Sequence, residues 1–339
     1  MKLFSTIKMK LSIIIVNYKT VNLVIDCLKS VYAFDTSEVE IIVVDNNSED
    51  NIEGVLKEKY PTIFFIQMGY NSGFARANNA AIKIAKGENI LLLNSDTINI
   101  ANAINKCDSL LRSSNYVAAG VQLLNEDGTP QISGNFAMKG GLNYLLPLPF
   151  VGNALKLIAG LLKVKKPSIE LTAQTIEVDW INGAFLMFKR NIINQAGLLD
   201  EDFFLYAEEA EWCSRIKKYG RLCIFGELNL YHLQGESSNG AFKSEGKGYY
   251  NIFDKKGFQI MLSNFVRIRK QFGVFWFVFD LIIYLFTIPI FFFGTIILKI
   301  IGSKKYDFNQ VRGYTKNTFQ LFNFLPKIIA KKPYFYKAL

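Results

Sequence analysis

The most informative stretch for chemistry is a short apolar run that ends in an amide, a hydroxyl and a carboxylate. Residues 88–93 read ENILLL, and Asn94, Ser95 and Asp96 follow directly. A run of this length suits a strand covered on both faces, and ligands of open α/β sheets bind beyond the carboxyl ends of such strands. Asp96 is therefore a candidate ligand-binding acid. N-capping of a following helix is the alternative, because Asn, Ser and Asp are all good N-caps.

Three earlier apolar runs have the same form and predict strands that also end in polar residues. They lie at 11–16, 40–44 and 62–67, and are followed by Asn17-Tyr18, by Asp45-Asn46-Asn47-Ser48 and by Gly69-Tyr70-Asn71-Ser72-Gly73. Helical spacing of apolar residues follows at 21–32, 50–59, 74–86 and 100–111. Strands that alternate with helices predict an α/β fold with a mainly parallel sheet flanked by helices, whose polar strand ends meet at one edge.

No glycine-rich phosphate loop accompanies these strands. The sequence has neither GxxxxGK[ST] nor GxGxxG after the first strand, so a phosphate-bearing ligand must be held by other groups. A divalent cation, Mg²⁺ or Mn²⁺, bound by hard oxygen ligands together with phosphate oxygens is one such means. Asp96 suits that role.

The second half of the chain is less regular. Residues 125–175 lose clear periodicity, which predicts a functional loop or a lid. Two short strands are expected within 176–190, around Asn182-Gly183, and a helix over 207–219 that Gly220 ends. A last strand is expected at 222–225, and His232, the one histidine of the chain, follows it.

Composition limits the classes of partner. The chain has 339 residues, 50% of them hydrophobic, and a net charge of +10, which points to nucleic acid, phosphorylated ligands or an anionic membrane surface. An apolar C-terminal stretch favours the last two over nucleic acid. The four cysteines, at 27, 107, 213 and 223, form no CxxC pair, which predicts reduced thiols in a cytosolic compartment.

The apolar stretch at 273–301 predicts membrane contact. Asp280 is its one charge before Lys299, Pro289 lies near its middle, and basic residues flank both of its ends. The positive-inside preference keeps both ends on the cytoplasmic face. It thereby favours a shallow hairpin or interfacial helices kinked at Pro289 over a single crossing. We therefore expect a peripheral or monotopic protein on the cytoplasmic face of the cell membrane. The alternative is that this stretch forms two buried helices of a soluble protein.

Five motifs together resemble family 2 inverting glycosyltransferases of the GT-A fold, and in particular rhamnosyltransferase-like enzymes of surface polysaccharide assembly. The motifs are residues 12–18, Val43 to Ser48, Asn71-Ser72-Gly73-Phe74-Ala75, Asn94-Ser95-Asp96, and Asp202 to Glu209. The resemblance covers about residues 11–238. It implies a nucleoside diphosphate sugar donor, a divalent cation, and a single displacement that inverts the anomeric carbon.

The resemblance also assigns candidate residues for binding the donor. Nucleotide-sugar binding is assigned to Asn17, Tyr18, Asp45, Asn71, Gly73, Arg76, Asn94, Ser95 and Asp96. Each of three residues has an alternative role. Asp45 could instead form a turn, Arg76 could be a solvent-exposed charge on a helix, and Gly73 could only mark a turn. Asp96 matches the last acid of the DxD metal motif, which reads Asn94-Ser95-Asp96 here, so one metal carboxylate is missing. His232 is the second candidate metal ligand, with a structural role as its alternative.

The family's catalytic base is the second acid of a pair that matches Glu208-Glu209. We therefore assign the base to Glu209 and retain Glu208 as a candidate, whereas Glu211 is expected to be structural. Acidic residues at a helix start are also explained by the helix dipole alone. Asp179 and Trp180 resemble the acceptor-side strand, where Trp180 either packs on a sugar face or fills the core.

The sequence thus predicts a GT-A catalytic domain over 1–240 and a membrane-associated helical region over 241–339. The two halves of the catalytic domain are expected at about 9–124, for the nucleotide sugar, and 125–240, for the acceptor. The expected reaction transfers a sugar, with rhamnose as one candidate, to a polyprenyl-linked saccharide, without nucleic acid. The rival interpretations are a nucleotidyltransferase and a membrane-bound scaffold that has lost activity.

Overall fold

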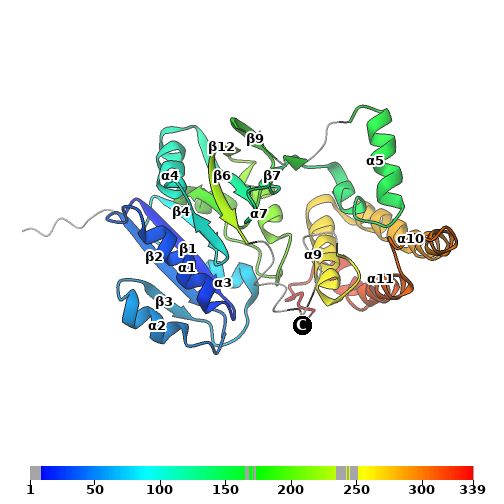
Figure 1. Cartoon of the computed structure of the whole chain (residues 1–339), viewed down its shortest axis with the longest axis horizontal. Coiled ribbons are helices and arrows are strands. Elements are labelled where there is room, and N and C mark those ends of the chain that lie inside the picture. Colours follow the sequence, from blue (N-terminus) through cyan, green and yellow to red (C-terminus); the bar gives the residue numbers. More distant parts are fainter. Residues whose placement is uncertain are drawn as a thin grey trace, which may run out of the picture. The chain divides into compact units, whose positions relative to one another are not determined.

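The computed structural model describes residues 9–338 except 165–167, 170, 172, 234–241, 243 and 245–250. Figure 1 shows its helices and strands along the chain. Residue contacts divide the chain into two compact units. Unit 1 consists of Met1–Phe136, Ser168–Asp200 and Glu209–Ser237, and unit 2 of Ala137–Pro167, Glu201–Glu208 and Ser238–Leu339.

This division differs from a single boundary near residue 240. Two segments within 1–240 belong to unit 2 because their apolar residues join its core. Leu145, Leu148 and Phe203 are buried in one cluster with residues of the C-terminal helices. The separate membrane-associated domain over 241–339 stays a prediction.

Unit 1 is built on a mixed sheet. Its strands are β1 (Leu11–Asn17), β2 (Val39–Asp45), β3 (Phe64–Gln67), β4 (Asn89–Asn94), β5 (Thr97–Asn99), β6 (Tyr116–Leu124), β9 (Thr175–Val178), β11 (Phe185–Lys189) and β12 (Arg221–His232). Their order is β3-β2-β1-β4-β11-β6-β12-β5, and β9 pairs with β12. Strands β1–β4, β6 and β12 run in one direction, since β11 is antiparallel to both β4 and β6. The predicted mainly parallel α/β sheet is confirmed.

Strand β12 is longer than the strand predicted at 222–225. Its pairing with β6 shifts register between Phe225 and Asn229 and then continues to Tyr231. A shift of this kind accommodates extra residues in one strand without ending the ladder. His232 therefore belongs to the end of β12, where it pairs with Thr97 of β5, and does not lie beyond the strand.

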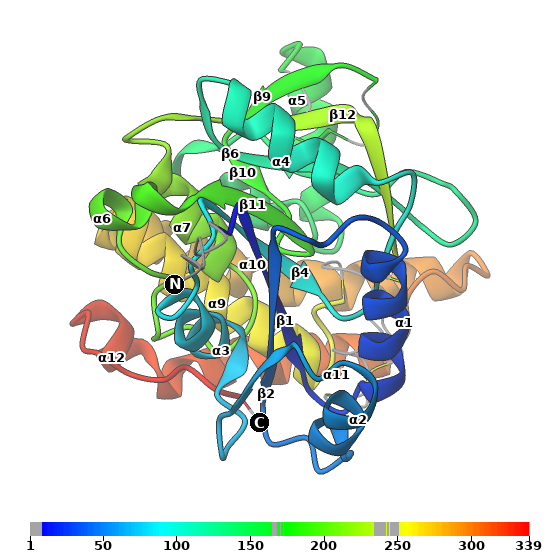
Figure 2. The ribbon, with the colours of Figure 1, turned by 90° about the vertical axis from the view of Figure 1, so that its left-hand side faces the viewer.

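Helices cover both faces of this sheet. The helices are α1 (Val21–Tyr32), α2 (Ile52–Lys59), α3 (Gly73–Ile82), α4 (Ala103–Ser113), α6 (Ile193–Ala196) and α7 (Glu208–Ile216), with the short turn η2 (Arg190–Ile192) before α6. Buried residues of α1 and α4 belong to one core cluster, and those of α3 and α7 to another. Figure 2 shows α1 and α3 on opposite sides of β1.

Residues 125–175 contain regular elements, so the expected lack of regular structure holds only in part, and their role as a functional loop or a lid stays a prediction. β7 (Gly134–Asn135) pairs with β10 (Trp180–Ile181) and with β8 (Ser168–Ile169) in a small sheet of unit 1. Unit 2 receives η1 (Lys139–Leu145) and the helix α5 (Val151–Leu161). Strands of two residues carry no detectable period, and α5 is a helix whose apolar residues are mostly exposed, so neither pattern is visible in the sequence.

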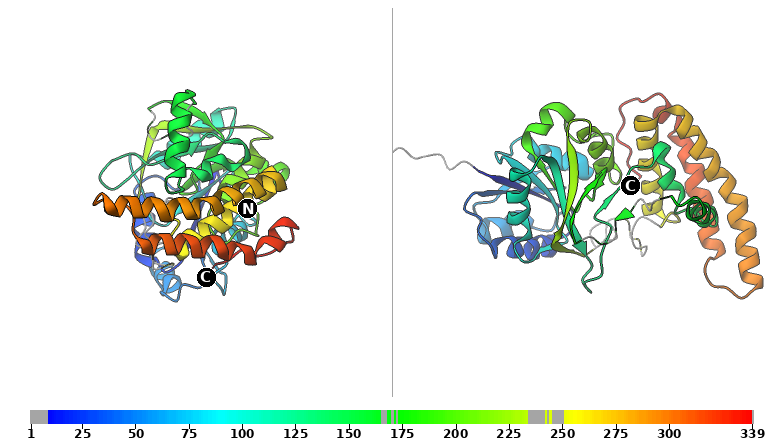
Figure 3. Two further views of the ribbon diagram at one scale, coloured as in Figure 1. Left: turned by 90° about the vertical axis from the view of Figure 1, so that its right-hand side faces the viewer. Right: turned by 90° about the horizontal axis from the view of Figure 1, so that it is seen from above.

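Unit 2 is helical and has an aromatic core. Its other elements are α9 (Lys255–Phe272), α10 (Val274–Ile300), α11 (Phe308–Gln320), η4 (Leu321–Asn323) and α12 (Leu325–Ile329). Figure 3 shows α9 in yellow, α10 in orange and α11 in red-orange, packed side by side. Phe265 contacts Phe277 and Tyr284, and Phe291 contacts Tyr314, with ring centroids 5.0–5.9 Å apart. Aromatic pairs at these separations stabilise a core beyond the area they bury.

Helix α10 continues through Pro289, so a hairpin that turns at this proline is excluded. Proline removes one backbone donor from the helix, and hydroxyl groups bond carbonyls in the preceding turn. Thr287 Oγ1 donates to the Ile283 carbonyl (2.8 Å), and Tyr314 Oη donates to the Tyr284 carbonyl (2.8 Å). Residues 274–300 therefore form one helix of 27 residues, the one described helix that is long and apolar enough to cross a membrane.

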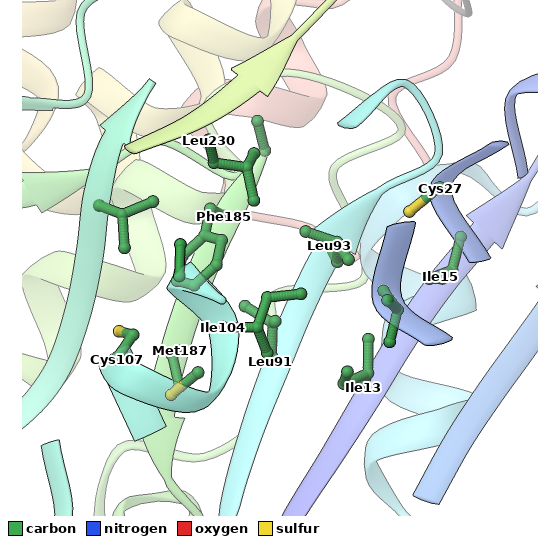
Figure 4. Packing of buried hydrophobic residues seen from close by; sticks show 14 of the residues in the cluster. Ile13, Ile15, Cys27, Leu91, Leu93, Ile104, Cys107, Phe185, Met187 and Leu230 are labelled. Carbon is green, nitrogen blue, oxygen red and sulfur yellow. The ribbon is translucent and has the colours of Figure 1, made fainter. Parts of the chain in front are cut away.

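Alternation along the central strands fixes the two faces of the sheet. Ile13 and Ile15 of β1 belong to the cluster under α1, whereas Ile14 belongs to the cluster under α3. Figure 4 shows the first cluster, in which Leu91 and Leu93 of β4 point to the same side as those of β1. Both faces are apolar because helices cover both, which is why β1 and β4 are near-continuous apolar runs.

Candidate active site

The C-terminal ends of neighbouring strands in unit 1 meet at one edge of the sheet. Asn17 at the end of β1 lies opposite Asp45 of β2, and Asp45 lies opposite Gln67 of β3. Asn94 ends β4 on the other side of β1. β12 runs in the same direction and ends at His232. The sheet thus collects the predicted site residues from distant parts of the chain.

The buried carboxylate of Asp45 is held by several hydrogen bonds. Its Oδ1 accepts from Asn17 Nδ2 (2.8 Å), and its Oδ2 accepts from Gln67 Nε2 (2.9 Å) and from the Ser48 backbone N–H (3.1 Å). Asn17 also donates to Ser48 Oγ (2.9 Å) and to the Asp50 carboxylate (3.1 Å). The fully buried Asn17 therefore ties the ends of β1 and β2 together and orients Asp45. Tyr18, the next residue, is half-buried.

The turn before α3 is fixed to the end of β2 by Asn46. Asn46 Nδ2 donates to the Gly73 carbonyl (3.0 Å), and its Oδ1 accepts from Ser72. Asn71 Oδ1 in turn accepts from the Gly73 backbone N–H (3.2 Å). Gly73 has φ of +73°, which disfavours any residue with a Cβ. Arg76 lies one turn into α3, half-buried, with Nη1 3.5 Å from Tyr70 Oη.

Asp96 lies in the turn between β4 and β5, not at the start of a helix, so the N-cap alternative is excluded. The turn is fixed on both sides. Thr97 Oγ1 donates to the Asn94 carbonyl (2.7 Å), and the Leu233 backbone N–H donates to the Asp96 carbonyl (2.8 Å). Ser95 Oγ lies 3.2 Å from Thr20 Oγ1. The Asp96 side chain is buried, and its Oδ1 has no hydrogen-bond partner within the described residues.

His232 faces this carboxylate oxygen. Its Nε2 lies 3.4 Å from Asp96 Oδ1, and its Nδ1 lies 2.8 Å from Gln131 Oε1. The Gln131 amide orientation follows from its Nε2, which donates to the His232 carbonyl (2.6 Å) and to Asn125 Oδ1 (2.7 Å). Gln131 Oε1 is an acceptor, so it receives the Nδ1–H. A neutral imidazole then presents the lone pair of Nε2 to Asp96.

Two Lewis bases that face each other in a buried place fit a shared cation. Cis ligands of an octahedral ion with bonds of about 2.1 Å lie about 3 Å apart, close to the observed separation of Nε2 and Oδ1. A second hydrogen bond from the other ring nitrogen is the usual support of a metal-binding histidine. Burial raises the pKa of the nearby Cys27 thiol to about 12, which keeps it protonated at neutral pH. No group of three His, Cys, Asp or Glu gathers among the described residues, and phosphate oxygens of a substrate and water are suitable further ligands.

The predicted catalytic acids begin helix α7. Glu208 and Glu209 are both buried. Tyr206 and Ala207 precede them with φ of +72° and +67°. Two consecutive non-glycine residues in the left-handed region are strained, and strain of this kind gathers at functional sites.

Glu209 lies beside the turn that joins β10 to β11. A Cβ built on Gly183 would stand 3.5 Å from Glu209 Cγ and 3.7 Å from the ring of Phe74. The next residue, Ala184, accepts a hydrogen bond from the Asn94 backbone N–H (3.0 Å). Glu209 is therefore packed against a turn that is bonded directly to the end of β4, the same strand end that carries Asp96.

Glu211 has a structural role. It forms an ion pair with Arg215, in which Nε and Nη2 each bond the carboxylate at 2.8 Å. Arg215 Nη2 also donates to the Leu198 carbonyl (2.8 Å), and the Trp212 indole donates to the Gly197 carbonyl (2.8 Å). These contacts hold the loop after α6 against α7.

The predicted acceptor residues lie next to the small sheet. Asp179 forms an ion pair with Lys217, which follows α7, and its backbone N–H donates to the Asn135 carbonyl (2.9 Å). Trp180 packs against the core cluster under α3, and its buried Nε1 has no hydrogen-bond partner within the described residues. A buried indole N–H without a partner is costly, so a ligand oxygen is a suitable acceptor for it.

Sequence reasoning missed the residues that support this site. Gln131 orients His232, and Ser48, Asp50 and Gln67 surround Asp45 and Asn17. Gln131 lies in the stretch without periodicity, where no sequence pattern marks it. Ser48 follows the predicted strand at 40–44, and Gln67 ends the predicted strand at 62–67. Their position at the ends of these strands is the sequence feature that could have identified them.

Comparison with known proteins shows which protein family part of this chain resembles. Residues 12–148 match the model of glycosyl transferase family 2. A low-salt glycan biosynthesis hexosyltransferase, Agl10 of Haloferax volcanii, is 29% identical over 212 residues, which are 61% of this chain and 62% of that protein. The chain thus spans less than two thirds of this relative.

Two further similarities concern smaller parts or the fold alone. WfaP of Escherichia coli, a UDP-Glc:alpha-D-GlcNAc-diphosphoundecaprenol beta-1,3-glucosyltransferase, is 36% identical over 98 residues, 27% of this chain and 39% of that protein. The crystal structure of GalNAc-T7 with UDP, GalNAc and Mn²⁺ aligns with a TM-score of 0.50 and 14% identity, covering 66% of this chain and 44% of the other.

The sheet order, the polar strand ends and the structural likeness define an α/β protein of the GT-A class. The chain carries a domain of glycosyl transferase family 2, as the sequence motifs indicate.

Proposed function

We propose that the protein transfers a sugar from a nucleoside diphosphate donor to a saccharide acceptor, with inversion at the anomeric carbon. The observation that carries this proposal is the Asp96–His232 pair, buried and facing each other at 3.4 Å, at the strand edge against which Glu209 also packs. A cation ligand pair beside a buried carboxylate suits a reaction in which negative charge leaves on a diphosphate.

The donor is expected to bind along the C-terminal edge of β1, β2 and β4. Asp45 presents the acid for the base or ribose, and Tyr18 borders it. Arg76 and the Asn71–Gly73 turn lie at the start of α3, where backbone N–H groups and a positive charge attract phosphate. Asn94 and Ser95 precede Asp96 and are expected to contact the sugar diphosphate.

Asp96 and His232 would hold Mg²⁺ or Mn²⁺, and Gln131 would fix the imidazole. When bound, the ion supplies charge neutralisation for the departing diphosphate. Glu209 accepts the proton of the acceptor hydroxyl while the acceptor oxygen bonds to the anomeric carbon. The bond from that carbon to the diphosphate oxygen breaks, and its electron pair remains on the nucleoside diphosphate.

Glu208 remains the alternative base, because it is buried in the same turn. Attack opposite to the departing diphosphate inverts the anomeric configuration in one step, so one carboxylate is enough. Asp179 and Trp180 are the acceptor-side residues of this proposal. The sugar is a hexose, with rhamnose as the candidate that the sequence resemblance suggests.

A lipid-linked saccharide is the proposed acceptor, and the cytoplasmic face of the cell membrane the proposed location. WfaP, similar over part of the chain, is named for an acceptor on diphosphoundecaprenol. The long apolar helix α10 supports membrane contact in this chain. Both features suit the assembly of a surface polysaccharide.

The test is a screen of nucleotide sugars against the purified protein, with and without polyprenyl diphosphate saccharides. We expect one donor to bind in the presence of Mn²⁺ and to be consumed with release of a nucleoside diphosphate once the acceptor is added. Release of pyrophosphate from a nucleoside triphosphate would indicate a nucleotidyltransferase instead. Donor binding without transfer to any acceptor, or no binding at all, would support a scaffold that has lost activity.

A further inference from the structure

The positive charge of the chain belongs to unit 2. This unit contains 21 Lys and Arg residues and seven Asp and Glu residues, a net charge of +14. Unit 1 contains 18 basic and 22 acidic residues, a net charge of −4. The net charge of +10 is therefore divided unequally, and unit 2 is the part whose net charge favours an extended anionic surface.

Helix α10 of unit 2 has one buried face and one exposed face, and the exposed face is apolar along its whole length. The buried residues are Phe277, Asp280, Leu281, Tyr284, Thr287, Phe291 and Thr295. The exposed residues on the opposite side are Phe275, Val278, Phe279, Ile282, Phe286, Ile290, Phe293, Ile297 and Ile300. At 100° per residue these nine side chains form one continuous stripe. Phe275 is 71% exposed and Ile300 79%. A contiguous exposed apolar surface of this kind marks a site of interaction with a partner or a membrane.

Helix α5 of unit 2 carries a second exposed apolar surface. Leu157 is 68% exposed, Ile158 50%, Leu161 76% and Leu162 71%. Lys156 lies on the opposite side of the helix, and residues 137–167 contain five lysines and no acidic residue. With 11 residues, α5 is about 16 Å long and cannot cross a bilayer. A short helix with an apolar stripe and basic residues is the form that lies in a membrane interface.

The residue that precedes α5 packs against α10. Phe150, which precedes α5, contacts Phe291 of α10 with ring centroids 6.3 Å apart, and it fills the space beside Gly294. Figure 3 shows α5 in green running at a steep angle to α10 in orange.

We propose that the exposed apolar residues of α5 and α10 form the lipid-binding surface of unit 2, by which this unit lies on an anionic membrane with both helices in the membrane plane. In this arrangement α10 enters the interface and does not cross the bilayer. The proposal rests on the membrane contact of the proposed function and adds α5 as its second element and an orientation. A second copy of the chain is disfavoured as the occupant, because two units of charge +14 repel each other.

Vesicle flotation tests the surface. The double variant Leu157→Glu/Leu161→Glu should bind vesicles of phosphatidylcholine with 30% phosphatidylglycerol at least tenfold more weakly than the wild type, and Phe286→Glu likewise. Leu171→Glu is the matched control in unit 1, where Leu171 is 67% exposed, and it should bind like the wild type. Added salt should weaken wild-type binding, because the charge attraction is screened.

Two results would overturn the proposal. One is unchanged vesicle binding of the α5 double variant while its far-ultraviolet circular dichroism matches the wild type. The other is a detergent-solubilised dimer that Phe286→Glu converts to a monomer, which would assign the surface to a second copy. Nucleotide-sugar binding by the same variants is measured in parallel. Its absence in every variant and the wild type would count against the proposed function and not against the surface.

The orientation has its own test. Single cysteines placed at Leu161, Phe275, Phe286 and Ile297 are spin-labelled, since the four native cysteines are buried. The proposal predicts similar shallow depths at all four positions. A crossing helix would instead place position 286 deepest and positions 275 and 297 near opposite surfaces of the bilayer, which would contradict it.

Discussion

The imidazole of His232 is held in one tautomer by a residue that no sequence pattern marks. Gln131 accepts the Nδ1–H, and this leaves the lone pair of Nε2 opposite Asp96 Oδ1. Replacing Gln131 by Leu removes the acceptor while keeping most of the volume. We expect Gln131→Leu to weaken Mn²⁺ binding in the presence of nucleoside diphosphate by about 10–100-fold, the usual effect of losing such a support.

Electron paramagnetic resonance of free Mn²⁺ measures this affinity without reference to turnover. Asp96→Asn should weaken binding further than Gln131→Leu. The control is Gln310→Leu, because Gln310 belongs to the capping box of α11 in unit 2. Unchanged Mn²⁺ affinity in both site variants would remove Asp96 and His232 from the cation site.

The side chain of Glu209 gives a second prediction at this scale. Glu209→Gln keeps the size of the side chain and removes its basicity, so donor binding should stay within twofold while turnover falls by roughly a hundredfold or more. Glu208→Gln is tested beside it, since both acids begin α7. A larger loss in Glu208→Gln than in Glu209→Gln would move the base to Glu208. The exposed Glu53→Gln on α2 serves as the control.

At the scale of elements, the segment before α7 is held by the C-terminal residues of unit 2. Gln259 of α9 is fully buried; its Nε2 donates to the Tyr336 carbonyl and to Ser263 Oγ (both 3.0 Å), and its Oε1 accepts from the Ala338 N–H (2.8 Å). Ser263 Oγ donates to the Leu205 carbonyl (2.7 Å). This chain of bonds leads to the strained residues Tyr206 and Ala207.

Gln259→Leu should therefore destabilise unit 2 by about 1–3 kcal/mol, because it removes the hydrogen bonds of the buried Gln259 side chain to the Tyr336 carbonyl and the Ala338 N–H. We also expect increased hydrogen exchange at residues 203–207 relative to the rest of unit 2. Asn323→Leu in η4 is the control for a polar-to-apolar change. Protection of residues 203–207 equal to that of the wild type would show that the C-terminal residues do not hold this segment.

Asp280 of helix α10 is expected to make the stability of unit 2 depend on pH. Both carboxylate oxygens are buried without hydrogen-bond partners within the described residues, and burial raises the pKa of Asp280 to about 7. In the unfolded chain the pKa is about 3.9. The folded state therefore binds the proton more tightly, and the contribution of Asp280 to stability is most favourable below about pH 4, falls up to about pH 7 and is constant above it.

Asp280→Asn keeps the shape and removes this titration. In detergent micelles we expect the variant to match the wild type at pH 4 and to exceed its unfolding free energy at pH 8, by up to about 4 kcal/mol for a shift of this size. Thermal unfolding across pH measures the difference. A difference that stays constant from pH 4 to pH 8 would mean that Asp280 is not protonated on folding.

The sequence allowed the strand ends to be predicted because apolar runs that stop at polar residues leave a clear pattern, as at Leu93 and Asp96. It did not allow Gln131 or α5 to be predicted. Gln131 lies outside the helices and strands, and α5 exposes its apolar side chains, so neither follows the rule that apolar spacing marks a buried face. Pro289 misled in the opposite direction, because α10 continues through it as one helix.

At the scale of the whole molecule, the chain divides its tasks between two units of opposite charge. Unit 1 carries the sheet edge with Asp45, Asp96 and His232, and unit 2 carries the positive charge and the apolar helices. The family 2 match begins at residue 12 and extends to residue 148, past the start of unit 2. The proposed transfer from a nucleoside diphosphate sugar to a lipid-linked acceptor would use the sheet edge of unit 1 and the apolar, basic surface of unit 2.

The most direct measurement is the anomeric configuration of the product, read by nuclear magnetic resonance with a donor labelled with ¹³C at the anomeric carbon. The account predicts one nucleoside diphosphate released for each glycosidic bond formed, with the configuration opposite to that of the donor, and loss of this signal in Glu209→Gln. A product with the configuration of the donor would contradict direct displacement with Glu209 as the base. Pyrophosphate in place of nucleoside diphosphate would contradict sugar transfer altogether.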